Sequence, residues 1–297
     1  LGLQAWQWMF ACLIIPAVFY IVFTTFIPES PRYLVSVGRR EEAERILVKV
    51  TADPDPAARV QAIADSMGSD GAVKMSVGQI WASQWRGLVL VGMAIAAFQQ
   101  LTGINGVFFY SNTLFGAVGF TEAMALQQTL IITAFKIVGV VSGILLVDKV
   151  GRKRMLIYGG TIIFLSLAVV ATVFTIAPIV NGKPDISSTP ALGFVAVAAL
   201  CTFIFGFTSS WGPIFSIVMG EMFPNQIRGG AMSLASGADF LVNFLVVLFF
   251  PYLIAWSPAG TYWIYCGFGV LAVIFTARYL HETTGTQLED VDKVVSK

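Results

Sequence analysis

A cluster of polar side chains lies inside an apolar stretch that is long enough to cross a lipid bilayer. Residues 99–110 read Gln-Gln-Leu-Thr-Gly-Ile-Asn-Gly-Val-Phe-Phe-Tyr. Each amide side chain offers both a donor and an acceptor of hydrogen bonds. Amides at this depth can simply form hydrogen bonds between neighbouring helices. Three amides beside aromatic residues, Gln99, Gln100 and Asn105, are more than such bonding requires. The cluster therefore predicts a path for a polar solute.

Two glycines in the cluster predict that its helix is not straight. On a straight helix, Asn105 points away from Gln100, whereas Gln99 and Tyr110 share a face. Gly103, with a second glycine three residues later, lets the helix bend or unwind. Irregular backbone is tolerated at membrane depth where it lines a wet cavity. We expect a local break at this point.

The elements that hold the cluster are predicted to be membrane-spanning helices. The chain is 57% hydrophobic and 12% charged, with a mean hydropathy of +0.79, so it has too few polar side chains to cover a globule of its size. A hydrocarbon core needs about 20 apolar residues. Runs of this kind predict an all-α membrane protein with seven spans, at 5–27, 87–115, 123–147, 155–178, 192–217, 231–256 and 260–280.

The distribution of basic residues predicts the orientation of these spans. Residues 28–86, 148–154, 218–230 and the tail from 278 hold 16 of the 18 Lys and Arg. The positive-inside rule places these segments in the cytoplasm. We expect four parts: a span at 1–27, a cytoplasmic linker with short amphipathic helices at 28–86, a six-helix part at 87–280, and a cytoplasmic tail at 281–297. The first residue, Leu1, and the odd number of spans suggest a piece of something larger.

Other functional classes have little support in the sequence. The three cysteines fall in apolar spans, where they are typical small buried hydrophobes. A single histidine, His281, and the lack of a Cys-x-x-Cys pair predict no metal site. We expect no cofactor and, because no nucleophile–base pair is visible, no enzyme activity. The net charge of +1 gives no indication of nucleic-acid binding.

Several short motifs occur along the chain in a distinctive order. They are Trp8-Met9-Phe10, Pro28-Glu29-Ser30-Pro31-Arg32-Tyr33-Leu34, the amide cluster, Asp148-Lys149-Val150-Gly151-Arg152-Lys153, Gly212-Pro213, Glu221-Met222-Phe223-Pro224 with Arg228-Gly229, and Glu282-Thr283-Thr284-Gly285. Together they resemble the sugar porter family of the major facilitator superfamily, in order and spacing over essentially the whole chain.

The resemblance implies a twelve-span transporter of two six-span halves, with alternating access to a central monosaccharide site. This chain then corresponds to the sixth span, the linker and the second half, and its partner is the missing N-terminal half. Family members place the acid that couples transport to protons on the first span, outside this sequence. We expect proton symport in the plasma membrane. A facilitated-diffusion uniporter and a non-transporting sugar sensor are the alternatives.

The resemblance also implies which residues meet the sugar. The amide cluster contributes Gln99, Gln100, Asn105, Phe109 and Tyr110. Further ligands fall on later spans, where this sequence departs from the family pattern: a usual Asn is Lys136, a usual Trp is Ser216, and the usual Asn-aromatic-x-x-Asn has become Asp239 followed by Asn243.

Lys136 and Asp239 are the ionisable residues in the middle of spans. Charges at this depth are costly and should face a cavity or a partner. The simplest interpretation is an ion pair between the two, which either pins two helices or grips the ligand. In the other interpretation, Lys136 meets a carboxylate of the substrate.

A second group of charged residues lies at the cytoplasmic ends of spans. The family uses such residues as a network that closes the cytoplasmic face and biases the conformational equilibrium. The resemblance assigns this gating role to Glu29, Arg32, Asp148, Arg152, Glu221 and Arg228.

Overall fold

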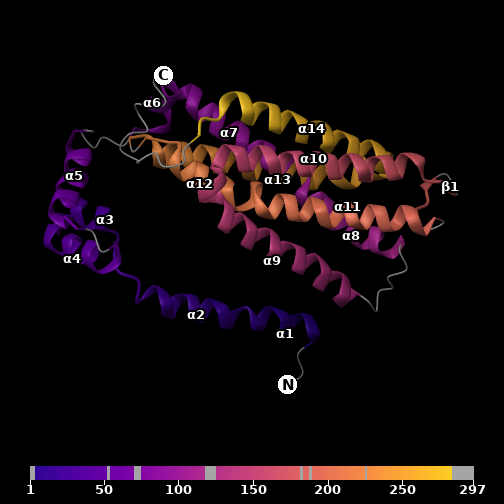
Figure 1. Ribbon diagram of the computed structural model, residues 1–297, viewed down its shortest axis with the longest axis horizontal. Helices are drawn as coiled ribbons and strands as arrows, with labels where there is room; N and C mark the ends of the chain where they lie inside the picture. The colour runs from indigo at the N-terminus through magenta and orange to yellow at the C-terminus, as the bar shows by residue number, and fades with distance from the viewer. Residues whose placement is uncertain are drawn as a thin grey trace. The chain divides into compact units, whose positions relative to one another are not determined.

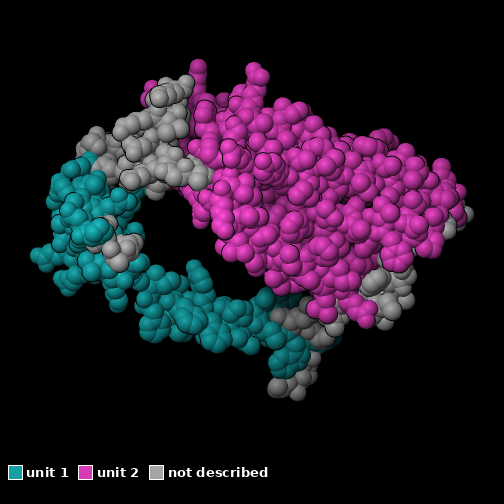
Figure 2. Space-filling model, viewed as in Figure 1, with its two compact units in different colours: residues 1–73 teal, residues 74–297 magenta. Residues whose placement is uncertain are grey.

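The computed structural model describes residues 4–51, 54–69, 75–117, 125–180, 183–186, 189–224 and 226–282. Contacts within the chain divide it into two compact units, residues 1–73 and 74–297 (Figure 2). The division falls inside the predicted linker. Each unit is described separately below.

The regular secondary structure in the described part of the first unit consists of helices joined by short turns. Its helices are α1 (Ala5–Cys12), α2 (Ile14–Thr24), α3 (Pro31–Ser36), α4 (Arg40–Thr51) and α5 (Pro56–Ser69). The expected span at 5–27 is thus split at Leu13. Pro16 explains the split, because its ring clashes with the carbonyl of Cys12 and its nitrogen cannot donate to it. The apolar helix that remains, Phe10–Thr24, is shorter than the other spans.

Helices α3, α4 and α5 pack on one another around a small apolar core of their own. These three helices lie in the segment 28–86, where the sequence predicts short amphipathic helices. Each contributes apolar residues to the core, while Tyr33, Val48 and Val50 are exposed on other faces. The buried members are Leu34, Val35, Ala43, Leu47, Val60 and Ile63.

The second unit is a bundle of long apolar helices (Figure 1). A short helix, α6 (Val77–Ala82), precedes them, and a two-stranded antiparallel ribbon of β1 (Ile179–Val180) and β2 (Lys183–Pro184) joins two of them. Within the described residues, six helical segments are long and apolar enough to cross a membrane, which confirms six of the seven predicted spans. Two of these segments, Arg86–Phe108 and Pro190–Glu221, each take in residues of two consecutive helices. The elements are α7 (Arg86–Leu101), α8 (Ile104–Ala117), α9 (Ala125–Val150), α10 (Arg152–Ile176), α11 (Pro190–Ser209), α12 (Trp211–Glu221), α13 (Arg228–Trp256) and α14 (Pro258–Tyr279).

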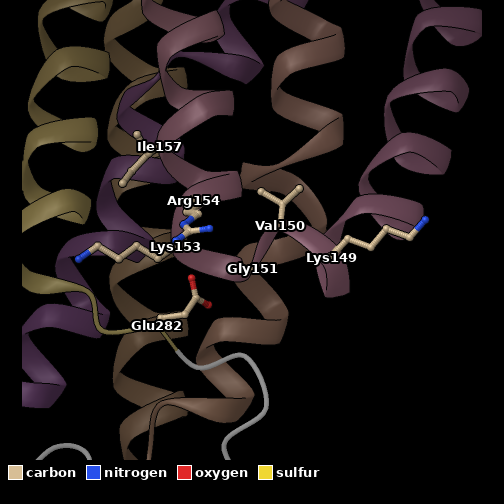
Figure 3. A pocket seen from close by; sticks show the side chains of 7 residues that line it. All are labelled: Lys149, Val150, Gly151, Lys153, Arg154, Ile157 and Glu282. Atoms are coloured by element: carbon tan, nitrogen blue, oxygen red, sulfur yellow. The ribbon is translucent and has the colours of Figure 1, made fainter.

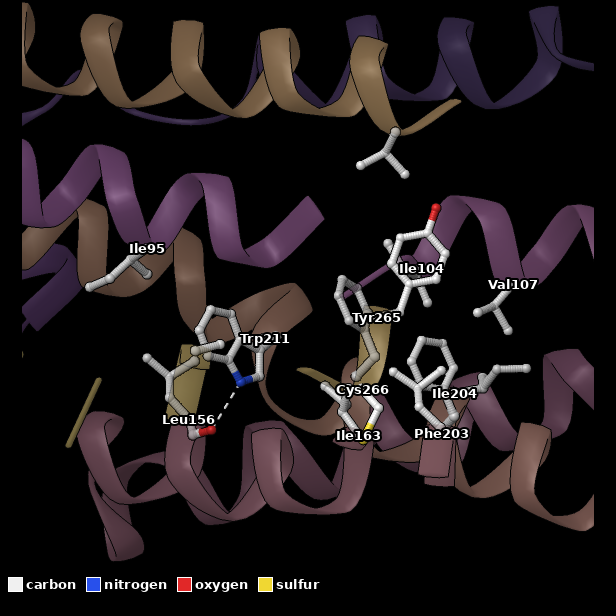
Figure 4. Packing of buried hydrophobic residues seen from close by; sticks show 14 of the residues in the cluster. Ile95, Ile104, Val107, Leu156, Ile163, Phe203, Ile204, Trp211, Tyr265 and Cys266 are labelled. Atoms are coloured by element: carbon white, nitrogen blue, oxygen red, sulfur yellow. Dashed lines mark hydrogen bonds between the residues drawn. The ribbon is translucent and has the colours of Figure 1, made fainter. Parts of the chain in front are cut away.

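Packing in this unit centres on α10, which lies against α14 and α11. Figure 4 shows apolar side chains from several helices meeting there, and Trp211 donates a hydrogen bond from Nε1 to the carbonyl of Leu156 at 2.9 Å. Helix α7 packs on α13, and α11 packs on α9. Helices α9 and α13 are the most exposed, with only 17% and 11% of their most apolar 18 residues buried.

Candidate functional site

The candidate site is built on a break between α7 and α8. Helix α7 ends at Leu101, and α8 begins at Ile104. Gly103, between them, has a φ of +78°, a conformation that side chains other than glycine rarely adopt. A Cβ at this position would also come within 2.8 Å of the ring of Tyr265. Glycine is therefore required here by both the backbone and the neighbouring ring, and the predicted break is present.

The break changes the direction in which the amides point. On a straight helix Asn105 would point away from Gln100, but here Asn105 Nδ2 donates to Gln100 Oε1 at 3.2 Å. The break that the sequence predicts accounts for this, because helical periodicity is lost at the left-handed residue. The two amides consequently act together.

Two side chains of α13 complete this polar cluster. Gln100 Nε2 donates to Asp239 Oδ1 at 2.9 Å, and Asn105 Nδ2 donates to Asn243 Oδ1 at 2.7 Å. Asp239 and Asn243 are four residues apart, so they share one face of α13. We call Gln100, Asn105, Asp239 and Asn243 the amide–carboxylate cluster.

The amide–carboxylate cluster keeps hydrogen-bonding capacity that its internal bonds leave unused. Asn105 Oδ1, Asp239 Oδ2 and the Nδ2 of Asn243 make no hydrogen bond to another described residue. These atoms include both donors and acceptors. A ligand with several hydroxyl groups, each a donor and an acceptor, matches this combination.

Lys136 does not form the expected ion pair. Its Nζ lies 4.0 Å from the centroid of the Phe108 ring, and no ion pair joins it to Asp239 within the described part of the chain. Helix α8, which carries Phe108, contacts both α9 and α13, so its aromatic ring covers the ammonium. A charge at the bilayer centre costs about 2.5–3.5 kcal/mol, whereas a cation–π contact returns about 0.5–2 kcal/mol.

The remaining predicted ligands are not joined to the cluster by hydrogen bonds. Gln99 has a buried Oε1 without a partner among the described residues. Ser216 is exposed on α12. The side chains of Phe109 and Tyr110 lie outside the described residues, although both positions belong to α8.

A second arrangement, formed by charged residues, joins three helices at the ends that the sequence predicts to be cytoplasmic. Arg152, at the start of α10, donates from Nη2 and Nε to the two carboxylate oxygens of Glu221 at 3.1 and 3.2 Å. Its Nη1 donates to Asp148 Oδ1 at 2.9 Å. The Arg152 side chain is only 13% exposed. We call Arg152, Asp148 and Glu221 the arginine clasp, since it ties α9 and α12 to α10.

The other predicted gating residues have different surroundings. Arg228 donates from Nε and Nη2 to the carbonyl oxygen of Phe223, at 3.1 and 3.0 Å, close to the end of α12. Glu29 and Arg32 belong to the first unit, and their gating role stays a prediction.

Sequence reasoning missed one residue of this region, Glu282. Its Oε1 accepts a hydrogen bond from the backbone N–H of Arg152 at 2.9 Å, and Figure 3 shows its carboxylate directed toward Gly151 at one edge of a pocket of about 450 Å³. Gly151 precedes α10 without a side chain that could cap the helix. A helix start of this kind needs an acceptor from elsewhere, which is the signal that could have identified Glu282.

Comparison with known proteins shows which family the chain is similar to. A family model described as sugar (and other) transporter matches residues 2–295. A glucose transport protein of Synechocystis sp. is 37% identical over 98% of this chain and 62% of its own length. The D-xylose-proton symporter of Escherichia coli is 33% identical over 98% of this chain and 57% of its own. The structure of the proton:xylose symporter XylE bound to 6-bromo-6-deoxy-D-glucose matches with a TM-score of 0.83 at 32% identity, covering 99% of this chain and 61% of that chain.

Six long apolar helices around a polar cluster define a multi-pass membrane protein of the major facilitator superfamily fold. The chain belongs to the sugar transporter family, as the motifs in the sequence indicated. It spans about three-fifths of the length of the curated relatives named above.

Proposed function

We propose that this protein carries a monosaccharide across the plasma membrane by alternating access, in symport with protons and together with the five remaining spans of the N-terminal half, which this chain does not include. The observation that carries the proposal is the amide–carboxylate cluster. It joins α7 and α8 to α13 at membrane depth and leaves both donors and acceptors unused. Sugar hydroxyls can satisfy these atoms, because each hydroxyl donates one hydrogen bond and accepts others.

The break at Gly103 supports alternating access. Asn105 lies on α8, on the far side of the break, while Gln100 lies on α7. A sugar bound to both amides would link the two helix segments. Movement of α8 relative to α7 would then change access to the site and the number of hydrogen bonds to the sugar together, so that binding shifts the conformational equilibrium.

The arginine clasp supports the second requirement of alternating access, a closed cytoplasmic side. Its bidentate contact is the strong, directional form of an ion pair. Opening a path between α9, α10 and α12 would break it. The free energy of the clasp would therefore set the balance between the two states.

Proton coupling is the part of the proposal supported by a relative alone. The E. coli protein is named as a proton symporter. Uptake by the full-length protein in proteoliposomes, with and without an inward proton gradient, distinguishes symport from uniport: a uniporter equilibrates its sugar in both cases, whereas a symporter accumulates it only with the gradient.

Sugar uptake by the Gln100→Ala variant tests the site. Each lost buried hydrogen bond costs about 1–3 kcal/mol, so we expect the half-saturation concentration to rise about tenfold with normal abundance in the membrane. Gln84→Ala is the matched control, because Gln84 is exposed ahead of α7. Unchanged half-saturation in Gln100→Ala would remove the cluster from the site, and absence of uptake of any monosaccharide by the wild-type protein would refute the function.

A further inference from the structure

Lys136 is a cation in the middle of a membrane-spanning helix, and it forms no ion pair with an acidic residue in the described part of the chain. It lies near the middle of the 26-residue α9, at a depth where charged side chains occur mainly with a partner or in a wet cavity. Within the described part of the chain, its one recorded contact is with the face of the Phe108 ring. This cation–π contact stabilises the ammonium by about 0.5–2 kcal/mol, which is less than the cost of about 2.5–3.5 kcal/mol of placing a charge at the bilayer centre. The position therefore favours an anion that the cation meets during function.

Asp239 is not that anion in this conformation. Its Oδ1 accepts from the amide of Gln100 at 2.9 Å, and α8 contributes the ring that covers the ammonium. The carboxylate thus belongs to the hydrogen-bonding cluster, while the cation stands apart from it. The two charges are separately placed instead of neutralising each other directly.

The spacing between the cation and the amide cluster fits one sugar ring. Asn105 and Phe108 are three residues apart on α8, so their side chains are neighbours on one helix face, about 5–6 Å apart at Cβ. The ammonium lies against the Phe108 ring, which is the side chain one helical turn along α8 from Asn105. A hexopyranose that is oxidised at C6 carries a carboxylate at one end and hydroxyls on the opposite side of the ring, across a similar length.

We propose that the substrate class of this site is the sugar acids, above all hexuronates, with Lys136 pairing with the carboxylate. This inference rests on the proposed transport function and specifies its substrate. Asn105 and Asn243 bind ring hydroxyls, and the Phe108 ring holds the ammonium in place while the site is empty. Ser216, where the family pattern has an aromatic residue, makes the wall of α12 smaller and more polar.

The test is uptake of D-glucuronate and D-galacturonate against D-glucose and D-xylose by the full-length protein in proteoliposomes. We expect the wild-type protein to take up a hexuronate with a half-saturation concentration at least tenfold below that for either neutral sugar. Lys136→Asn should remove this preference, and Lys136→Arg should keep it because the charge remains. Lys149→Asn, a change of the same type at an exposed position of α9, is the matched control and should leave the preference unchanged.

Three outcomes overturn the inference in different ways. Uptake of neutral sugars without uptake of hexuronates refutes the substrate class while leaving the proposed function intact, and this result needs no variant. Uptake of neither kind refutes the proposed function itself. If Lys136→Asn and Asp239→Asn each abolish uptake but the double variant restores it, the two residues neutralise each other, since removal of one partner strands a charge, and Lys136 has no role toward substrate.

Discussion

The amide–carboxylate cluster and the arginine clasp hold helices together by different means. The cluster uses three amides and one carboxylate, joined by single hydrogen bonds of 2.7–3.2 Å, and it leaves donors and acceptors unused. The clasp uses a bidentate ion pair in which one guanidinium serves two carboxylates. Hydrogen bonds between neutral groups can be exchanged for hydrogen bonds to a hydroxylated ligand at little cost. The clasp offers no such exchange, which suits a contact that is either closed or broken.

The largest expected effect is a loss of stability caused by a substitution in the backbone break that positions the amide–carboxylate cluster. Gly103→Ala places a side chain at a φ of +78° and against the Tyr265 ring, which should cost about 2–4 kcal/mol. Thermal unfolding of the purified protein measures this loss. Gly87→Ala is the control, because a Cβ at Gly87 meets nothing within 4 Å. Equal unfolding temperatures for the two variants would show that the break is not fixed by glycine.

The next largest effect distinguishes the arginine clasp from the amide–carboxylate cluster, because a change in the clasp should affect turnover more than the half-saturation concentration. Arg152→Ala should lower turnover at least about tenfold and change the half-saturation concentration less than about threefold, because the residue biases the conformational equilibrium without touching sugar. Sugar uptake over a range of concentrations measures both values.

Arg154→Ala is the matched control for this variant, since Arg154 is exposed on the same helix. A variant of Arg152 with normal turnover and weak affinity would contradict the assignment of the clasp as a gate.

A smaller effect shows whether the cluster acts as one unit. Asn105→Ala and Asn243→Ala should each raise the half-saturation concentration, at about 1–3 kcal/mol per lost hydrogen bond. Because the two amides are bonded at 2.7 Å, the double variant should lose less than the sum of the single losses, by about 0.5–3 kcal/mol. Ligand titrations of the four proteins give the coupling energy. Strict additivity would mean that the two amides bind substrate independently.

The contrast between these regions also explains what the sequence could predict. The spans and the break follow from properties that are local in sequence, namely apolar runs and the glycine at 103. The direction of Asn105 beyond the break could not be derived from the sequence, because one left-handed residue resets the helical phase for everything after it. The ion pair of Lys136 with Asp239 was wrong because opposite charges on two helices do not reveal that a third helix, carrying Phe108, covers one of them.

The sequence contains a signal for the split of the first expected span, Pro16, which a hydropathy average does not detect. Pro16 is apolar and leaves the hydropathy of the run high, but it removes a backbone donor. The family pattern predicted a network of six charged residues, and the geometry joins three of them directly as the arginine clasp. Glu282 was missed because the acceptor for the start of α10 comes from 130 residues later in the chain.

The smallest effect tests whether Glu282 acts as a helix cap or as part of the clasp. Glu282→Gln keeps an oxygen that can accept from the N–H of Arg152 but removes the charge at the start of α10, so it should lower stability by about 0.3–1 kcal/mol. Glu282→Ala removes the acceptor as well and should cost about 0.5–2 kcal/mol.

Thermal unfolding at low and high salt separates the two contributions of Glu282. Salt screens interactions between exposed charges, so the deficit of the Gln variant should shrink at high salt while that of the Ala variant remains. Asp65→Asn, which removes an exposed carboxylate far from the start of α5, is the control and should change little. Because Glu282 accepts from the backbone N–H of Arg152, whereas the Arg152 guanidinium donates to Asp148 and Glu221, we expect turnover to change less than about twofold in either variant. A tenfold loss of turnover would instead make Glu282 a member of the gate.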